Sequence, residues 1–250
     1  MVNPTISYYE KWLGGDGCLV MPGVQFIQSA ERDKVQPGYP TAFDLYLWHD
    51  NERIVISYSG SIADYVETLR TKLTTGQSVA DVKELLSKVF ECDIGHNVKF
   101  IFDQLPTEVV IDNVKTLTKT DYQDFETFFK TQHPSATDVS WLPEYFEEMV
   151  AENLCVAVYE GGKIVCCTDA PMMPYLENQV QESGVNTLPA YRKKGYAVIV
   201  CGQMITNVLA NGKVPQWSTT IDNVGSGRLA ERVGFKKLAD VLTITGYERD

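Results

Sequence analysis

The clearest chemical feature of this sequence is a basic, glycine-containing turn. Arg192-Lys193-Lys194-Gly195-Tyr196-Ala197 follows a strand-like stretch at 182–188 and precedes a long apolar helical pattern. Amide N–H groups at a helix N-terminus lie at the positive end of the helix dipole, where they bind phosphate. A glycine at position 195 lets a ligand approach the backbone with no Cβ in the way. The turn therefore indicates a phosphate-binding site, with a solvated basic loop before a helix as the alternative.

The same turn resembles a family motif. Residues 192–197 read R-x-x-G-x-A and are similar to the acyl-CoA pyrophosphate loop of the GNAT N-acetyltransferase superfamily, Q/R-x-x-G-x-G/A. Further motifs of one GNAT subfamily surround it: E-x-x-V-x-T at 182–187, P-x-W at 215–217, N-x-x-S-x-x-L-A-E at 223–231 and Gly-Phe at 234–235. The motifs span about residues 182 to 235, and the order of strands and helices extends the resemblance back to about residue 109.

The resemblance implies a reaction and its co-substrate. GNAT enzymes hold acyl-CoA between two diverging parallel strands, and an amine attacks the thioester directly. Acetyl-CoA is then the expected co-substrate, a small-molecule amine is the expected acceptor, and no metal is required. The residues that the resemblance implies for acetyl-CoA are Val185, Asn186, Thr187, Arg192, Lys193, Lys194, Gly195, Tyr196, Ala197, Asn223 and Ser226. Asn223 and Ser226 have a second reading as helix caps.

Glu182 is the candidate general base. A primary ammonium near pKa 10 is mostly protonated at neutral pH, so a group must accept its proton before it attacks. Glu182 begins the strand-like stretch where the resemblance implies the base, and backbone N–H groups around 185–187 would polarise the thioester carbonyl. Many GNAT enzymes protonate the leaving thiolate with a Tyr that Ala230 replaces here. Tyr191, Tyr196 or solvent then remain as proton donors.

Trp217 has two possible roles, and several other sequence patterns are incomplete. Trp217 is expected either in a substrate wall or in the core. The glycines at 225 and 227 do not complete G-x-G-x-x-G, and no G-x-S-x-G elbow is present. The three histidines are scattered, without H-E-x-x-H, so the sequence predicts no metal site.

Composition excludes some partners. The 33 acidic and 22 basic residues give a net charge of -11, which argues against binding to nucleic acid or anionic lipid. The beginning of the sequence lacks a signal-peptide pattern, no apolar run is long enough to span a membrane, and the six cysteines suit buried reduced thiols. We therefore expect a cytoplasmic protein. The acidic charge also favours a cationic acceptor, such as a polyamine or an aminated antibiotic.

The elements that must position these residues suggest two parts. Residues 45–58 read as a hairpin, and apolar stripes at 62–73 and 82–89 as helices, the second behind a Ser78/Asp81 capping box. A second hairpin is predicted at residues 154–168. Further strands are predicted at 98–102, 109–117, 217–221 and 241–247. Further helices are predicted at 121–129, 141–150, 197–209 and 223–233. We predict an α+β protein: a smaller N-terminal α+β domain (1–108) and a GNAT-like domain (109–250) whose mixed, mostly antiparallel sheet is flanked by helices.

Three function classes follow. The first is an N-acetyltransferase that acts by direct attack in a ternary complex. The second is a catalytically weak or inactive acyl-CoA-binding module of the same fold. The third is a non-catalytic protein whose N-terminal half mediates assembly. The basic turn favours the first two, and Glu182 favours the first. The N-terminal half carries no chemical motif, so we expect it to close one side of the acceptor site or to form a homo-oligomer interface.

Overall fold

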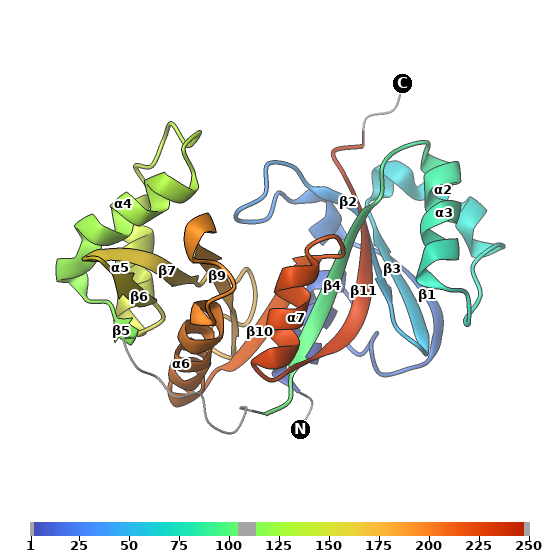
Figure 1. Ribbon diagram of the computed structural model, residues 1–250. Coiled ribbons are helices and arrows are strands. Elements are labelled where there is room, and N and C mark those ends of the chain that lie inside the picture. Colours follow the sequence, from blue (N-terminus) through green and yellow to red (C-terminus); the bar gives the residue numbers. More distant parts are fainter. Residues whose placement is uncertain (1–2, 105–113, 248–250) are drawn as a thin grey trace.

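Two sheets organise the protein, shown in Figure 1 as a computed structural model that describes residues 3–104 and 114–247. A seven-stranded sheet has the order β1-β3-β2-β11-β4-β10-β8, and a four-stranded sheet has the order β5-β6-β7-β9. The only parallel pairs in them are β1 with β3 and β8 with β10. The predicted α+β class with a mixed, mostly antiparallel sheet is confirmed.

The strands of the large sheet come from both ends of the chain. They are β1 (Gly23–Gln28), β2 (Phe43–His49), β3 (Arg53–Tyr58), β4 (Gly95–Phe102), β8 (Val180–Glu182), β10 (Val214–Thr220) and β11 (Phe235–Thr245). The small sheet holds β5 (Val114–Thr116), β6 (Val156–Glu160), β7 (Lys163–Asp169) and β9 (Gly184–Thr187). The strand predicted at 241–247 begins earlier, at Phe235, and most of the strand predicted at 109–117 lies outside the described residues.

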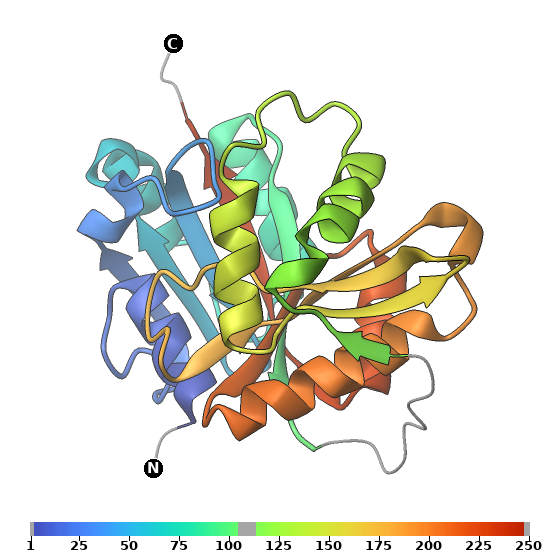
Figure 2. The same cartoon turned by 90° about the vertical axis from the view of Figure 1, so that its left-hand side faces the viewer.

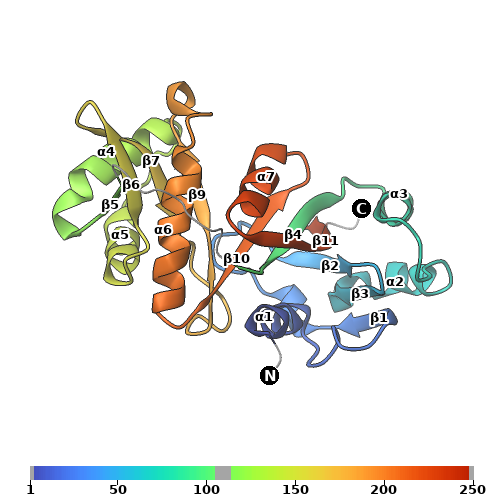
Figure 3. The same cartoon turned by 60° about the horizontal axis from the view of Figure 1, so that its bottom comes forward.

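Seven α-helices are present among the described residues. They are α1 (Pro4–Leu13), α2 (Ala63–Arg70), α3 (Val79–Phe90), α4 (Tyr122–Gln132), α5 (Leu142–Ala151), α6 (Tyr196–Ala210) and α7 (Val224–Arg232). In Figure 3, α6 lies beside β9, and α7 lies beside β10, with α1 near the large sheet. Figure 2 shows α4 and α5 in front of the small sheet. The predicted capping box is confirmed: Ser78 and Asp81 exchange side-chain-to-backbone bonds of 3.2 Å at the start of α3.

Helices cover both faces of the large sheet. Because successive side chains of a strand point to opposite faces, each face has its own apolar core. Leu45 and Leu47 of β2 pack with apolar residues of α2 and α3. Tyr46 and Trp48 point to the opposite face and pack with α1. Successive side chains of a strand alternate between faces, so a strand buried on both sides reads as a continuous apolar run. The predicted hairpin at 45–58 is thereby confirmed as β2 and β3.

The two predicted domains share the large sheet. β4, from the N-terminal segment, lies between β10 and β11, with Lys99 opposite Ser218 on one side and Ala239 on the other. The residues on the two sides of the expected 108/109 boundary therefore hydrogen-bond in one sheet. The boundary itself falls outside the described residues, and the division into domains stays a prediction.

Other expectations concern cysteines, metals and membranes. All six cysteines are free thiols, and five of them are buried, as predicted for reduced core residues. Within 3–104 and 114–247, no helix has the length and apolar character needed to cross a membrane. The same described residues contain no group of three or more His, Cys, Asp or Glu side chains that could hold a metal.

We predict that a fragment of residues 109–250 does not fold by itself. It lacks β2 and β4, so β10 loses one hydrogen-bonded neighbour and β11 loses both. Unpaired strand edges are costly when buried and aggregate when exposed. Circular dichroism and thermal unfolding of the soluble fraction provide the measurement. Co-expression with residues 1–108 should restore a cooperative transition, whereas a fragment that melts cooperatively alone would contradict the prediction.

Candidate functional site

A fork between two strands forms the centre of the site. Val180–Glu182 of β8 pairs in parallel with Val214–Gln216 of β10, and the Ser183 N–H donates to the Gln216 carbonyl at 2.9 Å. After that bond the chain leaves the large sheet and pairs as β9 with β7 of the small sheet. β9 and β10 diverge from this point (Figure 3). A cleft of about 820 Å³ is lined by residues of both strands.

The backbone of β9 presents unpaired groups to this cleft. The Leu188 N–H donates to Val165 of β7, whereas the Ser183 N–H points to β10. Because backbone amides alternate along a strand, the N–H and C=O of Val185 and the N–H of Thr187 point towards β10, which has separated from them. The Thr187 carbonyl on this edge accepts the Arg192 Nε. Extended ligands bind such open edges as an added strand does. The edge therefore suits the amide-containing pantetheine arm of a CoA thioester.

The phosphate-binding turn forms one end of the cleft. Gly195 is the left-handed N-cap of α6, with a φ of 87°, and Tyr196 and Ala197 begin the helix. Lys193 is also left-handed, with a φ of 63°, a conformation that costs a non-glycine residue energy. Arg192 and Lys193 line the cleft, and the Arg192 Nε donates to the Thr187 carbonyl at 3.2 Å. Free amides and two cations therefore converge at the start of α6.

The Lys194 side chain lies outside the cleft lining. Its ammonium lies 3.4 Å from the Glu160 carboxylate and 4.8 Å from the centre of the Tyr191 ring. Tyr196 also donates its hydroxyl to Glu160. The described lining of the cleft includes every residue predicted to contact acetyl-CoA except Lys194. Lys194 thus fastens the turn to the β6–β7 hairpin in this structure.

The opposite wall comes from β10 and α7. The Asn223 carboxamide accepts the Ser226 N–H at 3.2 Å, and the Ser226 hydroxyl accepts the Trp217 indole N–H at 3.0 Å. Trp217 is 2% exposed and packs against Phe235, so it lies at the base of this side of the cleft. Ala230 is fully buried beneath it, and a Tyr at that position would have to displace core side chains.

Glu182 lies where the strands separate, on the opposite face from Trp217. Its carboxylate accepts the Ser218 hydroxyl at 2.8 Å. Lys99 of β4 is paired with Ser218 across the sheet, which places its side chain on that same face. Burial raises the pKa of the Glu182 carboxyl, while Lys99 and the Ser218 hydroxyl and N–H oppose the rise. Burial also lowers the pKa of the Lys99 ammonium.

Two further acceptor-side residues were missed by sequence reasoning. Asp169 ends β7 opposite Gly184, and the Tyr145 hydroxyl of α5 donates to its carboxylate. A Cβ added at Gly184 would lie 3.2 Å from the Asp169 Cβ, so glycine permits this close approach. The sequence shows only an acidic residue at the end of an apolar strand. That residue indicates a functional site only when the pairing of β7 with β9 is known.

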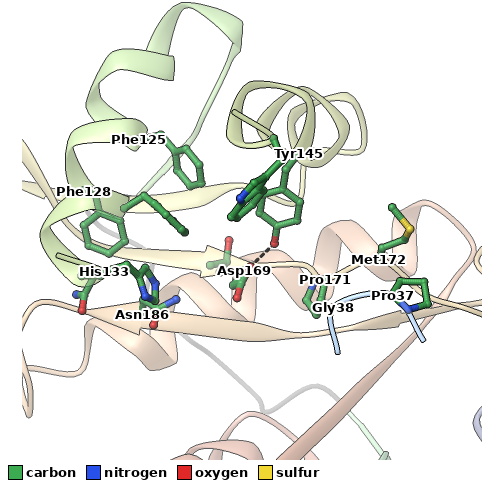
Figure 4. A pocket seen from close by; sticks show the side chains of 14 residues that line it. Pro37, Gly38, Phe125, Phe128, His133, Tyr145, Asp169, Pro171, Met172 and Asn186 are labelled. Atoms are coloured by element: carbon green, nitrogen blue, oxygen red, sulfur yellow. Dashed lines mark hydrogen bonds between the residues drawn. The ribbon is translucent and has the colours of Figure 1, made fainter. Parts of the chain in front are cut away.

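A second pocket adjoins the cleft on the side of α4 and α5. It encloses about 450 Å³, and Figure 4 shows aromatic side chains above Asp169 and Asn186. Asp169 and Asn186 also line the cleft, so the two spaces meet at these residues. The cleft therefore lies against α6 and α7, and the second pocket lies against α4 and α5.

The chain is similar to known proteins. The profile of the family GNAT acetyltransferase matches residues 49–240, a range that includes strands from both sides of residue 109. A curated relative, "Uncharacterized N-acetyltransferase YdfB" of Bacillus subtilis, is 30% identical over 112 residues, 43% of this chain and 41% of that protein. The match therefore spans less than half of the relative.

Solved structures show a similar fold. An acetyltransferase of the GNAT family from Colwellia psychrerythraea matches with a TM-score of 0.52 and 15% identity, over 65% of this chain and 60% of that chain. A GCN5-related N-acetyltransferase from Sphaerobacter thermophilus matches with a TM-score of 0.50 and 15% identity, over 67% of this chain and 58% of that one.

We predict that Gly195→Glu abolishes acetyl-CoA binding. The substitution puts a carboxylate beside the amides that would hold the pyrophosphate. The Kd should rise about 100-fold or more, since hydrogen bonds to charged groups are worth about 1.5–3 kcal/mol each. Gly212→Glu is the matched control, because Gly212 follows the other end of α6 and is also left-handed, with a φ of 74°. Equal calorimetric affinities of the two variants would refute the assignment.

We also predict that Lys99→Met shifts the pH dependence of the reaction. The Lys99 ammonium lowers the pKa of the buried Glu182 carboxyl, and its removal leaves the burial effect unopposed by that charge. The acid limb of the kcat/KM profile should therefore move to higher pH. Lys99→Arg keeps the charge and should leave the limb near its original position. An unchanged limb in the Met variant would separate Lys99 from the titrating group.

Proposed function

The chain belongs to the GNAT acetyltransferase family, and we propose that it transfers the acetyl group of acetyl-CoA to a primary amine of a small molecule. One observation carries this proposal. The fork between β8–β9 and β10 opens onto the N-terminus of α6 on one side and joins the pocket beneath α5 on the other. A donor and an acceptor therefore reach the same point from opposite sides.

The described residues suit acetyl-CoA, the acyl donor of this family. Free amides at the start of α6, with Arg192 and Lys193, match the charge of the pyrophosphate. The N–H and C=O of Val185 and the N–H of Thr187 match the amides of the pantetheine arm. This edge of β9 leads from the turn to Ser183, so the thioester would lie at the fork.

The proposed reaction is direct aminolysis. The lone pair of the neutral amine attacks the thioester carbonyl carbon, and a C–N bond forms. The C–S bond then breaks, and its electron pair leaves with the sulfur. The nitrogen loses one proton to a base, and the thiolate of CoA gains one from an acid. Backbone N–H groups of β9 that face the cleft would stabilise the charge that develops on the carbonyl oxygen.

Glu182 is the proposed base. It lies at the fork on the sheet face opposite Trp217 and lines neither the cleft nor the second pocket. Its raised pKa makes the carboxylate a better proton acceptor than an ordinary Glu. Ser218 fixes one of its oxygens at 2.8 Å. The acid has no side chain at position 230, and the Tyr196 hydroxyl already donates to Glu160. Tyr191, which lines the cleft, and solvent remain as the proton donors for the thiolate.

We predict that Glu182→Gln lowers kcat about 100-fold or more at neutral pH, the usual cost of removing a positioned base. The loss should shrink at high pH, where the amine deprotonates unaided. Acetyl-CoA affinity should change little. The measurement is a pH–rate profile of CoA release with an accepted amine, and Glu177→Gln, at an exposed neighbouring position, is the control.

A stability measurement distinguishes lost chemistry from lost folding. Burial raises the pKa of folded Glu182 above the ordinary value of about 4.5. Below about pH 4.5 the folded and unfolded states both hold the proton, and stability is then lost as the pH rises from there through the folded pKa. Glu182→Gln should therefore melt at or above the wild-type Tm at pH 7. A variant that melts lower and loses activity in proportion would indicate a structural role. Acetyl-CoA binding without transfer to any amine would favour an inactive binding module.

A further inference from the structure

We propose that the accepted amine carries an aromatic or branched aliphatic group, which occupies the pocket between α4, α5 and β7. This inference rests on the proposed function, because it concerns the acceptor of that reaction. It replaces the polyamine favoured by the net charge of -11 with a single ammonium on an apolar body. The evidence is the lining of the pocket, the charge at its inner end and the segment that covers it.

The lining of the pocket is mainly apolar, and five of its residues are Phe, Trp or Tyr. Phe125 and Phe128 of α4 are 4% and 5% exposed, and their rings face the space from one side. Tyr145 of α5 and Trp141, the N-cap residue of that helix, line it with their ring centres 5.6 Å apart. Gln132, His133, Thr168 and Asn186 add polar groups to the lining. The apolar part of the surface is stabilised by an apolar ligand.

One carboxylate lies at the inner end. The Tyr145 hydroxyl donates to Oδ1 of Asp169, and Oδ2 has no hydrogen-bond partner within the described part of the chain. Asp169 is the only acidic residue among the described residues that line this pocket. A single carboxylate ringed by aromatic faces pairs with one ammonium through charge and cation–π attraction. A polyamine would leave its other ammonium groups against apolar surface.

The size and depth of the pocket agree with a small ligand. Ligand pockets typically enclose about 300–1,000 Å³, and this one encloses about 450 Å³. Because Asp169 and Asn186 also line the acetyl-CoA cleft, an amine held at Asp169 lies at the junction of the two spaces. The apolar body then extends away from the fork, towards Trp141 and Met172 at the exposed mouth.

The N-terminal segment covers part of this pocket. Pro37 and Gly38 line it opposite α4. The neighbouring Gln36 is 6% exposed and donates to the Tyr175 hydroxyl at 3.1 Å, and Tyr175 in turn donates to Glu31. These bonds tie the covering loop to residues that precede β8. The segment thus contributes an apolar wall, and this supports the expectation that the N-terminal half closes one side of the acceptor site.

Two measurements on the full chain test the proposal. The first compares kcat/KM for 2-phenylethylamine, isoamylamine and spermidine by CoA release. We expect each apolar monoamine to exceed spermidine at least about tenfold, because an unpaired ammonium would otherwise be buried. The second measures binding of 2-phenylethylamine by calorimetry in the presence of CoA, which requires no turnover. Asp169→Asn should weaken this binding at least about tenfold.

Apolar variants at the mouth provide the matched test. Trp141→Ala and Met172→Ala should raise the KM for 2-phenylethylamine several-fold and leave the KM for acetyl-CoA unchanged. Met172 and Met21 are similarly exposed, at 61% and 67%, and Met21 does not line the pocket. Met21→Ala should therefore change neither constant. Both pocket residues are exposed enough to be replaced without opening the core.

The outcomes separate this proposal from the proposed function. Preference for spermidine, or wild-type binding of 2-phenylethylamine by Asp169→Asn, would overturn the assignment of the pocket while acetyl transfer stands. Binding of 2-phenylethylamine that depends on Asp169 and Trp141, without transfer to any amine, would support the pocket and overturn the proposed function. Absence of any binding by the apolar amines would overturn the pocket assignment directly.

Discussion

The end of one hydrogen-bond ladder determines where this protein can bind anything. The chain at 180–187 uses one edge to pair with β10 and then the other edge to pair with β7, and Ser183 is the point of exchange. The outer edge of β8 has partners in Leu176, Met173 and the Gln181 side chain, whereas β9 turns the N–H groups of Val185 and Thr187 towards the open space beside β10. Buried N–H and C=O groups need partners. A ligand with amides along its length supplies them. Gly184 keeps this exchange possible, because a side chain there would crowd Asp169 of β7.

Strand alternation then separates the two sides of the site. Trp217 and Phe100 are paired across β10 and β4 and point to the face that carries α7. The next pair, Ser218 and Lys99, points to the other face, where Glu182 accepts the Ser218 hydroxyl. The faces of Glu182 and Lys99 are set by the registers of β8 and β4 on β10. A shift of either register by one residue would move that side chain to the face that carries α7.

Local features were predictable and distant pairings were not. The turn at 192–197 and the capping box of α3 are encoded within a few residues, and both hairpins have polar turns between apolar runs. Lys194 was expected to contact acetyl-CoA because it lies in the motif at 192–197. Its ion-pair partner Glu160 is 34 positions away in sequence, so the sequence did not reveal that contact. Lys99 and Asp169 show no motif of their own. Their roles depend on β4 entering the sheet beside β10, and on β7 lying beside β9.

The position of β11 also affects how the chain can be made. This strand pairs with β2 and β4, so Thr245 lies opposite Phe43 in the finished sheet. Such non-local contacts slow folding, because the loop between them must close before they form. During synthesis the ribosome releases β2 and β4 long before β11, and the two strands must wait with open edges. The nascent chain should therefore depend on chaperones that shield strand edges until residue 245 has emerged.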